Sequence, residues 1–390
     1  MPGHPIQSPV GDLKAQYLQN KASIIDAIAQ MPLRAKGIRR HLKQLAHLAD
    51  ELLRTLWARQ GFGPDVGLIA VGGFGRGELL PYSDIDVLIL IADMDETLKG
   101  QLERFIGECW DAGLDIGSSV RTLAECETEA QSDVTVRTAM LESRPLVIAP
   151  DTYAHWRQRT LAHLEPKTFF TAKVLEMRQR HQRFENTPYA LEPNCKESPG
   201  GLRDLQVLLW VAHAAGLGDR WDALETSGMA TAHEVKQLRS NEALLLLLRA
   251  RLHIAARRRE DRLVFDMQQQ LAASFGLNAE INNGRLAKRP SETLMRTYYW
   301  AAKAVTQLNQ ILLLNIENKL KGLKLPLPEE RQVIHGAFFE HDGMLEVSHE
   351  TLFLEQPERI LETFWLFQNQ PSCHGLSART LRALYNARSA

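Results

Sequence analysis

The sequence predicts an α+β fold, in which a small domain built on a mixed β-sheet is followed by a helical bundle domain. Two observations carry this prediction. Short apolar runs, a glycine-rich turn and a helical segment alternate between residues 61 and 150, as in a small α/β unit. Beyond residue 150, Leu, Ala, Arg and Gln dominate, β-branched residues become sparse, and long helical patterns recur.

Length and composition allow two or three ordinary globular domains in the 390 residues. The chain is 44% apolar and its 46 Lys and Arg nearly balance 47 Asp and Glu, which argues against disorder and against a nucleic-acid-coating protein. The four cysteines form no C-x-x-C pair, so neither a zinc site nor a disulfide framework is expected. No signal peptide or membrane-length apolar run occurs, and we expect a cytoplasmic protein that binds no membrane and no nucleic acid.

The N-terminal half is predicted element by element from its periodicity. Apolar residues recur at helical spacing through residues 13–59, and Gly61 to Pro64 end that helical region. There follow a strand at 66–71, a glycine-rich turn at 72–77, a strand at 84–91, a helix at about 96–111 and a strand at 114–120.

The remaining chain is predicted to be helical over 202–215, 232–259 and 291–320, and to contain mixed short elements after 325. The predicted organisation is an N-terminal helical segment (1–60), the mixed-sheet domain (61–150), a helical domain (151–325) and a mixed segment (326–390).

The most informative stretch is residues 72–86, which read GGFGRGELLPYSDID. Asp84 and Asp86 open an apolar strand, so both side chains project to one face, about 7 Å apart. Paired carboxylates of this kind bind hard divalent cations. Gly72 and Gly73 let backbone N–H groups approach a phosphate closely, and Arg76 offers it a cation. The segment therefore combines a phosphate cradle with a metal clamp, which phosphoryl-type transfer needs.

Neither half of the motif is specific alone, because D-x-D pairs occur by chance and glycine-rich turns are commonly only turns. Asp93 and Asp95 form a second D-x-D that lacks glycines upstream, and we interpret it as a solvated turn. The spacing also excludes a P-loop. The joint pattern of strand, Gly-Gly, and Asp-apolar-Asp opening another strand is the informative feature.

This joint pattern resembles the signature of the DNA polymerase β-like nucleotidyltransferase superfamily, and most closely that of the bifunctional PII uridylyltransferase/uridylyl-removing enzymes. Three further segments resemble that family: WDAGLDIGSSVRT at 110–122, KESPGGLRDLQ at 196–206 and LHIAARRREDRL at 252–263. The resemblance spans about residues 60–310.

The resemblance implies a magnesium-dependent transferase that moves a uridylyl group from UTP to a tyrosine of the PII nitrogen-signalling protein. It implies two Mg²⁺ ions, with Mn²⁺ as an alternative, held by Asp84 and Asp86, and a nucleotide site that includes Ser83. In the family, an HD hydrolase domain and two ACT domains follow. Residues 326–390 are interpreted as leading towards an HD domain that this chain lacks, and His341-Asp342-Gly343 as a turn.

Asp115 is the candidate third carboxylate. On a strand over 114–120 it would share a face with Gly117, Ser119 and Arg121, and could complete the metal site or act as general base. The alternative is a strand-end carboxylate paired with Arg121.

Two basic segments each have a functional and a structural interpretation. Lys196 and Arg203 flank the turn at 199–201 and could reach a triphosphate, or could form structural ion pairs at a helix entry. The basic run from Arg257 to Arg262 could meet phosphates or an acidic protein surface, or could be a solvated helix face. The alternatives to uridylylation of PII are nucleotidyl transfer to another acceptor and a non-catalytic nucleotide sensor.

Overall fold

The structure, a computed structural model, describes residues 10–282, 285–322 and 332–388. The chain divides into two compact units. The first contains the described part of 1–164 together with 190–196 and 242–298, and the second contains 165–189, 197–241 and the described part of 299–390. The domains predicted from composition, with limits at 60, 150 and 325, are consecutive, whereas these units interleave. The long helices α11 (Ala232–Ala256) and α13 (Pro290–Lys321) contribute to both.

Two helices, α1 (Val10–Ala29) and α2 (Ile38–Gln60), occupy the region predicted to be helical without interruption. That prediction is wrong at residues 30–37, where Pro32 lacks the N–H that a helix interior requires. The apolar positions of α2 that suggested the helix are all buried. The helix ends at Gly61, whose φ of 63° is accessible to glycine at little cost.

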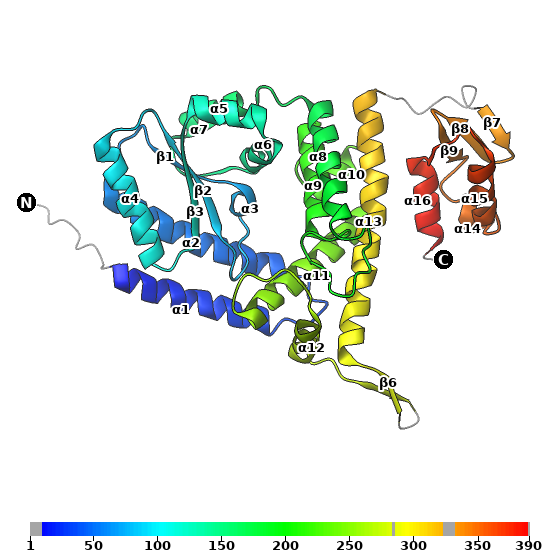
Figure 1. Cartoon of the computed structure of the whole chain (residues 1–390), viewed down its shortest axis with the longest axis horizontal. Helices are drawn as coiled ribbons and strands as arrows, with labels where there is room; N and C mark the ends of the chain where they lie inside the picture. The colour runs from blue at the N-terminus through cyan, green and yellow to red at the C-terminus, as the bar shows by residue number, and fades with distance from the viewer. Residues whose placement is uncertain (1–9, 283–284, 323–331, 389–390) are drawn as a thin grey trace, which may run out of the picture. The chain divides into compact units, whose positions relative to one another are not determined.

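The sheet of the first unit is mixed, as the sequence predicts, and its strand order is β3-β2-β1-β4. Strands β1, β2 and β3 are labelled in Figure 1. Its strands are β1 (Gly67–Ala70), β2 (Ile85–Ile91), β3 (Ile116–Thr122) and β4 (Arg144–Val147). β1 is antiparallel to β2 and β4, and β2 is parallel to β3. The third strand begins at 116 rather than 114, which leaves Asp115 just outside it. The short edge strand β4, which contains Pro145, was not predicted.

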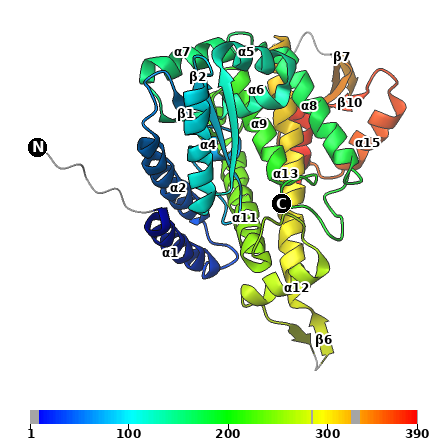
Figure 2. The ribbon, with the colours of Figure 1, turned by 60° about the vertical axis from the view of Figure 1, so that its left-hand side comes forward.

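Helices cover the sheet. α5 (Leu123–Ser132), α6 (Val134–Leu141) and α7 (Pro150–Leu161) gather together in both views of the chain (Figures 1 and 2). They share a buried cluster with the strands, in which Ile69 and Leu88 lie with Cys126, Met140 and Trp156. α4 (Glu96–Asp111), which has the predicted bounds, packs on α2.

The remaining elements of the first unit follow α11. They are α12 (Phe265–Ser274) and the two-stranded pair β5 (Glu280–Asn282) and β6 (Arg285–Lys288).

The second unit is mainly helical up to α13, as predicted, with α8 (Pro166–Gln182), α9 (Leu202–Ala214) and α10 (Trp221–Thr226). A small sheet of order β10-β9-β8-β7 and three short helices follow. These elements are β7 (Gln332–His335), β8 (Phe338–His341), β9 (Met344–Val347), α14 (Leu352–Glu355), α15 (Arg359–Asn369), β10 (Gly375–Leu376) and α16 (Ala378–Ala387). The predicted turn is confirmed, since Asp342 and Gly343 join β8 to β9 with positive φ.

Candidate functional site

Asp84 and Asp86 lie where the glycine-rich segment meets β2. The buried residue between them, Ile85, donates its backbone N–H to the carbonyl of Asp115 at 2.8 Å. The carbonyl of Asp86 accepts the backbone N–H of Val71 at 3.1 Å. β2 begins at Ile85, one residue later than predicted, so Asp84 immediately precedes the strand. Because side chains alternate along a strand, Asp86 points away from the buried side of Ile85, and the charge of Asp84 acts on the carboxyl of Asp86. The structure thus brings the predicted acidic pair and the glycine segment together.

The predicted glycine-rich turn begins with a single helical turn, α3 (Gly72–Gly75). Gly75 has no room for a side chain, because an added Cβ would lie 1.8 Å from the carbonyl oxygen of Glu142. Gly72 has a φ of 56°, which favours glycine. Close packing therefore requires glycine at position 75 and backbone conformation favours it at position 72, whether or not a phosphate binds.

Two glycines flank the carboxylate of Asp86. A Cβ added to Gly72 would lie 3.6 Å from its Oδ2, and one added to Gly117 would lie 3.0 Å from its Oδ1. Gly117 faces Asp86 through the parallel pairing of β3 with β2. The sequence predicts that Gly117 shares a face with Asp115, whereas its position opposite Asp86 depends on strand register, which is set by tertiary pairing.

Several charges converge on Asp86. Burial is the main cause that raises the pKa of its carboxyl, and the negative charge of Asp84 raises it further. Arg259 and Lys196 act in the opposite direction, and Asp115 adds a smaller increase. The negative charge of the two carboxylates is not fully compensated, and the glycines beside Asp86 have no side chains to block its oxygens. Both features suit a divalent cation, because such a cation relieves the repulsion between carboxylates. The donor set of Asp84 and Asp86 therefore fits the predicted metal.

Asp115 is exposed and lies on the loop that precedes β3. Within the described ranges, no group of three or more His, Cys, Asp or Glu residues is close enough to hold an ion, so Asp115 does not complete a three-ligand set in this structure. Its proposed partner Arg121 instead contacts Glu129 at 3.7 Å. Burial lowers the pKa of Lys21 in α1, and the negative charge of Asp115 acts in the opposite direction.

Three of the four nucleotide-site candidates outside the glycines belong to the first unit, where they have different surroundings. Arg76 forms an ion pair with Glu142 at 2.6 Å. Burial would lower the pKa of Arg76, but the charge and hydrogen bond of Glu142 outweigh it and raise the pKa. Ser83 immediately precedes Asp84 and donates its backbone N–H to Leu80. Lys196 belongs to the same unit as Asp86 and lies near enough to lower its pKa.

Arg203 belongs to the second unit, whereas Asp84 and Asp86 belong to the first. The predicted turn at 199–201 and the helix start at Leu202 are confirmed. Arg203 donates to Glu197 at 3.3 Å and lies over the ring of Trp210 at 5.2 Å. These contacts match the structural reading of this residue.

The basic run after α11 is a loop and not the solvated helix face that was considered. The helix predicted to reach 259 ends at Ala256, and Arg257 takes a left-handed φ of 52°. Arg259 then reaches Asp84, with Nη1 2.9 Å from Oδ2. No local signal in the sequence distinguishes Arg259 from the other arginines of this run, because its partner lies 175 positions away.

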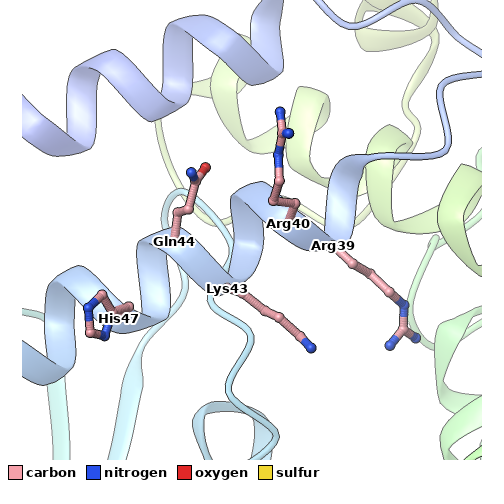
Figure 3. Close-up of a pocket in the computed structure, with 5 residues that line it drawn as sticks. All are labelled: Arg39, Arg40, Lys43, Gln44 and His47. Atoms are coloured by element: carbon pink, nitrogen blue, oxygen red, sulfur yellow. The ribbon is translucent and has the colours of Figure 1, made fainter.

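The cavity drawn in Figure 3 lies along α2 and measures about 450 Å³. It is lined by Arg39, Arg40, Lys43, Gln44 and His47, none of which sequence analysis had selected. Arg39 and Lys43 point to one side of the helix, whereas Arg40 and Gln44 point to the other, so these groups do not converge on one ligand (Figure 3). The cavity is separate from the carboxylate pair.

Known families match three successive parts of the chain. A nucleotidyltransferase domain family matches residues 50–143, the GlnD PII-uridylyltransferase family matches 168–313, and the uridylyltransferase GlnD third domain matches 338–390. The first match contains Asp84, Asp86 and all glycines of α3. Among the described residues, no helix has the length and apolar character needed to cross a membrane.

Curated relatives match nearly the whole chain. The bifunctional uridylyltransferase/uridylyl-removing enzyme of Cupriavidus pinatubonensis is 53% identical over 350 residues, which are 89% of this chain and 39% of the relative. The protein of that name from Burkholderia orbicola is 48% identical over 394 residues, covering 100% of this chain and 44% of the relative. The protein of that name from Ralstonia nicotianae is 50% identical over 347 residues, which are 89% of this chain and 39% of the relative. The chain thus spans about two fifths of the length of these relatives.

Proposed function

Since the chain belongs to the GlnD uridylyltransferase family, we propose that it transfers a uridylyl group from UTP to a tyrosine of the PII nitrogen-signalling protein and releases pyrophosphate. The observation that carries the proposal is the carboxylate pair of Asp84 and Asp86 beside the glycine turn. The family matches support the same reaction and supply its acceptor, which the geometry alone does not select.

The carboxylate pair is proposed to hold Mg²⁺, as two ions, with Mn²⁺ as an alternative. When bound, a divalent cation would lower the pKa of the attacking hydroxyl and neutralise phosphate charge. The chain supports this role by placing the carboxylate of Asp86 between Gly72 and Gly117, which have no side chains to cover its oxygens.

The other proposed roles follow from position. The backbone of Gly72 and Gly73 would accommodate the nucleotide phosphates, and Ser83 and Lys196 would lie beside them. Arg76 would contribute its charge while remaining paired with Glu142. Asp115 is retained as a candidate general base, because it is exposed next to β3 and influences Asp86. Arg203 has structural partners, which makes it the weakest of the proposed nucleotide-binding residues.

A transfer assay tests the proposal. The chain is incubated with α-labelled UTP, Mg²⁺ and a PII-family protein, beside the Asp84→Asn and Asp86→Asn variants. Asp93→Asn is the matched control, since Asp93 belongs to the exposed second D-x-D. We expect label on PII with the wild type and the control, and a loss of about 100-fold or more in either site variant.

Replacing the acceptor tyrosine of PII with phenylalanine should abolish labelling. Equal labelling by the site variants and the wild type would contradict the assigned site. UTP binding without labelling of PII would contradict the acceptor and favour another acceptor or a nucleotide sensor.

A further inference from the structure

Arg259 and Asp84 form an ion pair between the basic loop and the proposed metal site. Nη1 of Arg259 lies 2.9 Å from Oδ2 of Asp84. The two side chains are 50% and 42% exposed. A pair this exposed to water adds little to stability, since water solvates both charges well when they are apart. Either charge can therefore exchange its partner readily.

The loop that carries Arg259 is nevertheless held firmly. The carboxylate of Asp261 accepts hydrogen bonds from Arg249 at 2.5 and 3.2 Å and contacts Nε2 of His253 at 3.3 Å. The carbonyl of Asp261 accepts the backbone N–H of Cys195 at 2.7 Å. Arg249, His253 and Cys195 are all buried. An exposed guanidinium thus projects from a rigid base.

Arg259 differs from its neighbours in the basic run. Arg258 pairs with Glu260 at 2.6 Å, and Arg262 pairs with Glu192 at 3.5 Å. Neither Glu260 nor Glu192 is among the predicted site residues. Arg259 instead contacts a carboxylate that must exchange its partner if a metal ion is to bind there.

We propose that Arg259 is a partner-switching residue of the nucleotide site. It neutralises Asp84 while no divalent cation is bound, and it turns to the phosphates of the nucleoside triphosphate when a cation takes Asp84. The planar guanidinium fork suits phosphate oxygens, and the rigid loop keeps it beside the site in both states. This inference rests on the proposed function.

The test uses two binding measurements on the whole chain that require no turnover. Mn²⁺ binding without nucleotide is followed by electron paramagnetic resonance. Binding of uridine 5′-(α,β-methylene)triphosphate with Mg²⁺ is followed by calorimetry. For Arg259→Ala we expect Mn²⁺ to bind about threefold more tightly, because a weak competitor is gone. We expect the analogue to bind about tenfold more weakly, because a charge-assisted hydrogen bond is lost.

Arg258→Ala is the matched control and should leave both constants unchanged. Arg259→Lys keeps the positive charge but lacks the planar guanidinium. The lysine should therefore compete with Mn²⁺ for Asp84 as arginine does, and should recover only part of the nucleotide affinity. The switch is supported if Arg259→Ala binds Mn²⁺ more tightly and the nucleotide analogue more weakly than the wild type does. A change in only one constant, changes in the same direction, or no change overturns it.

Failure of the proposed function would look different. If the wild type bound neither Mn²⁺ nor the analogue, the proposed function and the switch would both fall. If the wild type bound both and labelled PII, while Arg259→Ala behaved like the wild type, only the switch would be overturned. Thermal unfolding of each variant checks that the binding data refer to folded protein.

Discussion

Asp50 of α2 and Arg144 of β4 form a two-point ion pair, with oxygen–nitrogen distances of 2.6 and 3.0 Å. Asp50 is only 6% exposed. The same guanidinium donates to the carbonyl of Phe74 at 3.3 Å and lies over its ring. A single arginine therefore ties the glycine segment of the proposed site to a helix and to the edge strand.

Removing the carboxylate of this pair should destabilise the first unit. In Asp50→Ala, the partly buried guanidinium of Arg144 loses its counter-charge, and we expect a loss of about 3 kcal/mol in the free energy of unfolding. Urea unfolding of the variant measures it. Glu51→Ala, on the exposed side of the same helix, should change the free energy by about 0.5 kcal/mol or less. Equal effects of the two substitutions would contradict the assigned role.

Two glycine-to-alanine substitutions should have opposite effects. Gly75→Ala places a Cβ 1.8 Å from the carbonyl oxygen of Glu142, and we expect a cost of about 3 kcal/mol because the neighbouring atom is backbone. Gly107→Ala meets nothing within 4 Å inside α4, and should stabilise the protein by about 0.5 to 1 kcal/mol. Unfolding midpoints in denaturant compare them. A stable Gly75→Ala protein would mean that α3 is packed more loosely than the structure has it.

Asp86→Asn should be more heat-stable than the wild type at pH 8 in a metal-free buffer. Because the pKa of Asp86 is raised on folding, its carboxyl favours the folded state at low pH, and this contribution is lost as the pH rises through the raised value. Asparagine stays neutral throughout. The difference in melting temperature between Asp86→Asn and the wild type should therefore become smaller as the pH falls towards about 4.

The control for that experiment is Asp93→Asn, which replaces an exposed carboxylate. A melting temperature for Asp86→Asn at or below that of the wild type at pH 8 would show that the carboxylate is better compensated than we infer.

Asp261 should show the opposite pH dependence. Burial alone would raise the pKa of Asp261, but hydrogen bonds from His253 and Arg249 outweigh it and lower the pKa. Its contribution to stability is therefore present above the ordinary carboxyl pKa and is lost as the pH falls through the lowered value. We expect Asp261→Ala to cost about 3 kcal/mol at pH 7, and the difference from the wild type to shrink in acid. Urea titrations at several pH values measure this.

Asp266→Ala offers a matched control, since Asp266 is exposed in the first turn of α12. It should cost about 0.5 kcal/mol or less at every pH. A pH-independent effect of Asp261→Ala would contradict the hydrogen-bond account.

Much of the first unit could be predicted locally. β1, β2 and α4 were found within two residues, because apolar periodicity and turn residues report directly on short elements. The break at residues 30–37 was missed, since apolar residues continue on both sides of it. The edge strand β4 was missed because four residues that include a proline carry no strand pattern.

For the site, the acidic pair, the glycine turn beside it and the family could all be predicted from the sequence. These depend on residues within one short segment, where spacing along the chain fixes which face each side chain takes. The position of Gly117 beside Asp86 and the contact of Arg259 with Asp84 follow from the tertiary structure. The tertiary structure also places Arg203 in another unit than the carboxylate pair. Such relationships depend on strand register and on contacts between distant segments, which local spacing cannot encode.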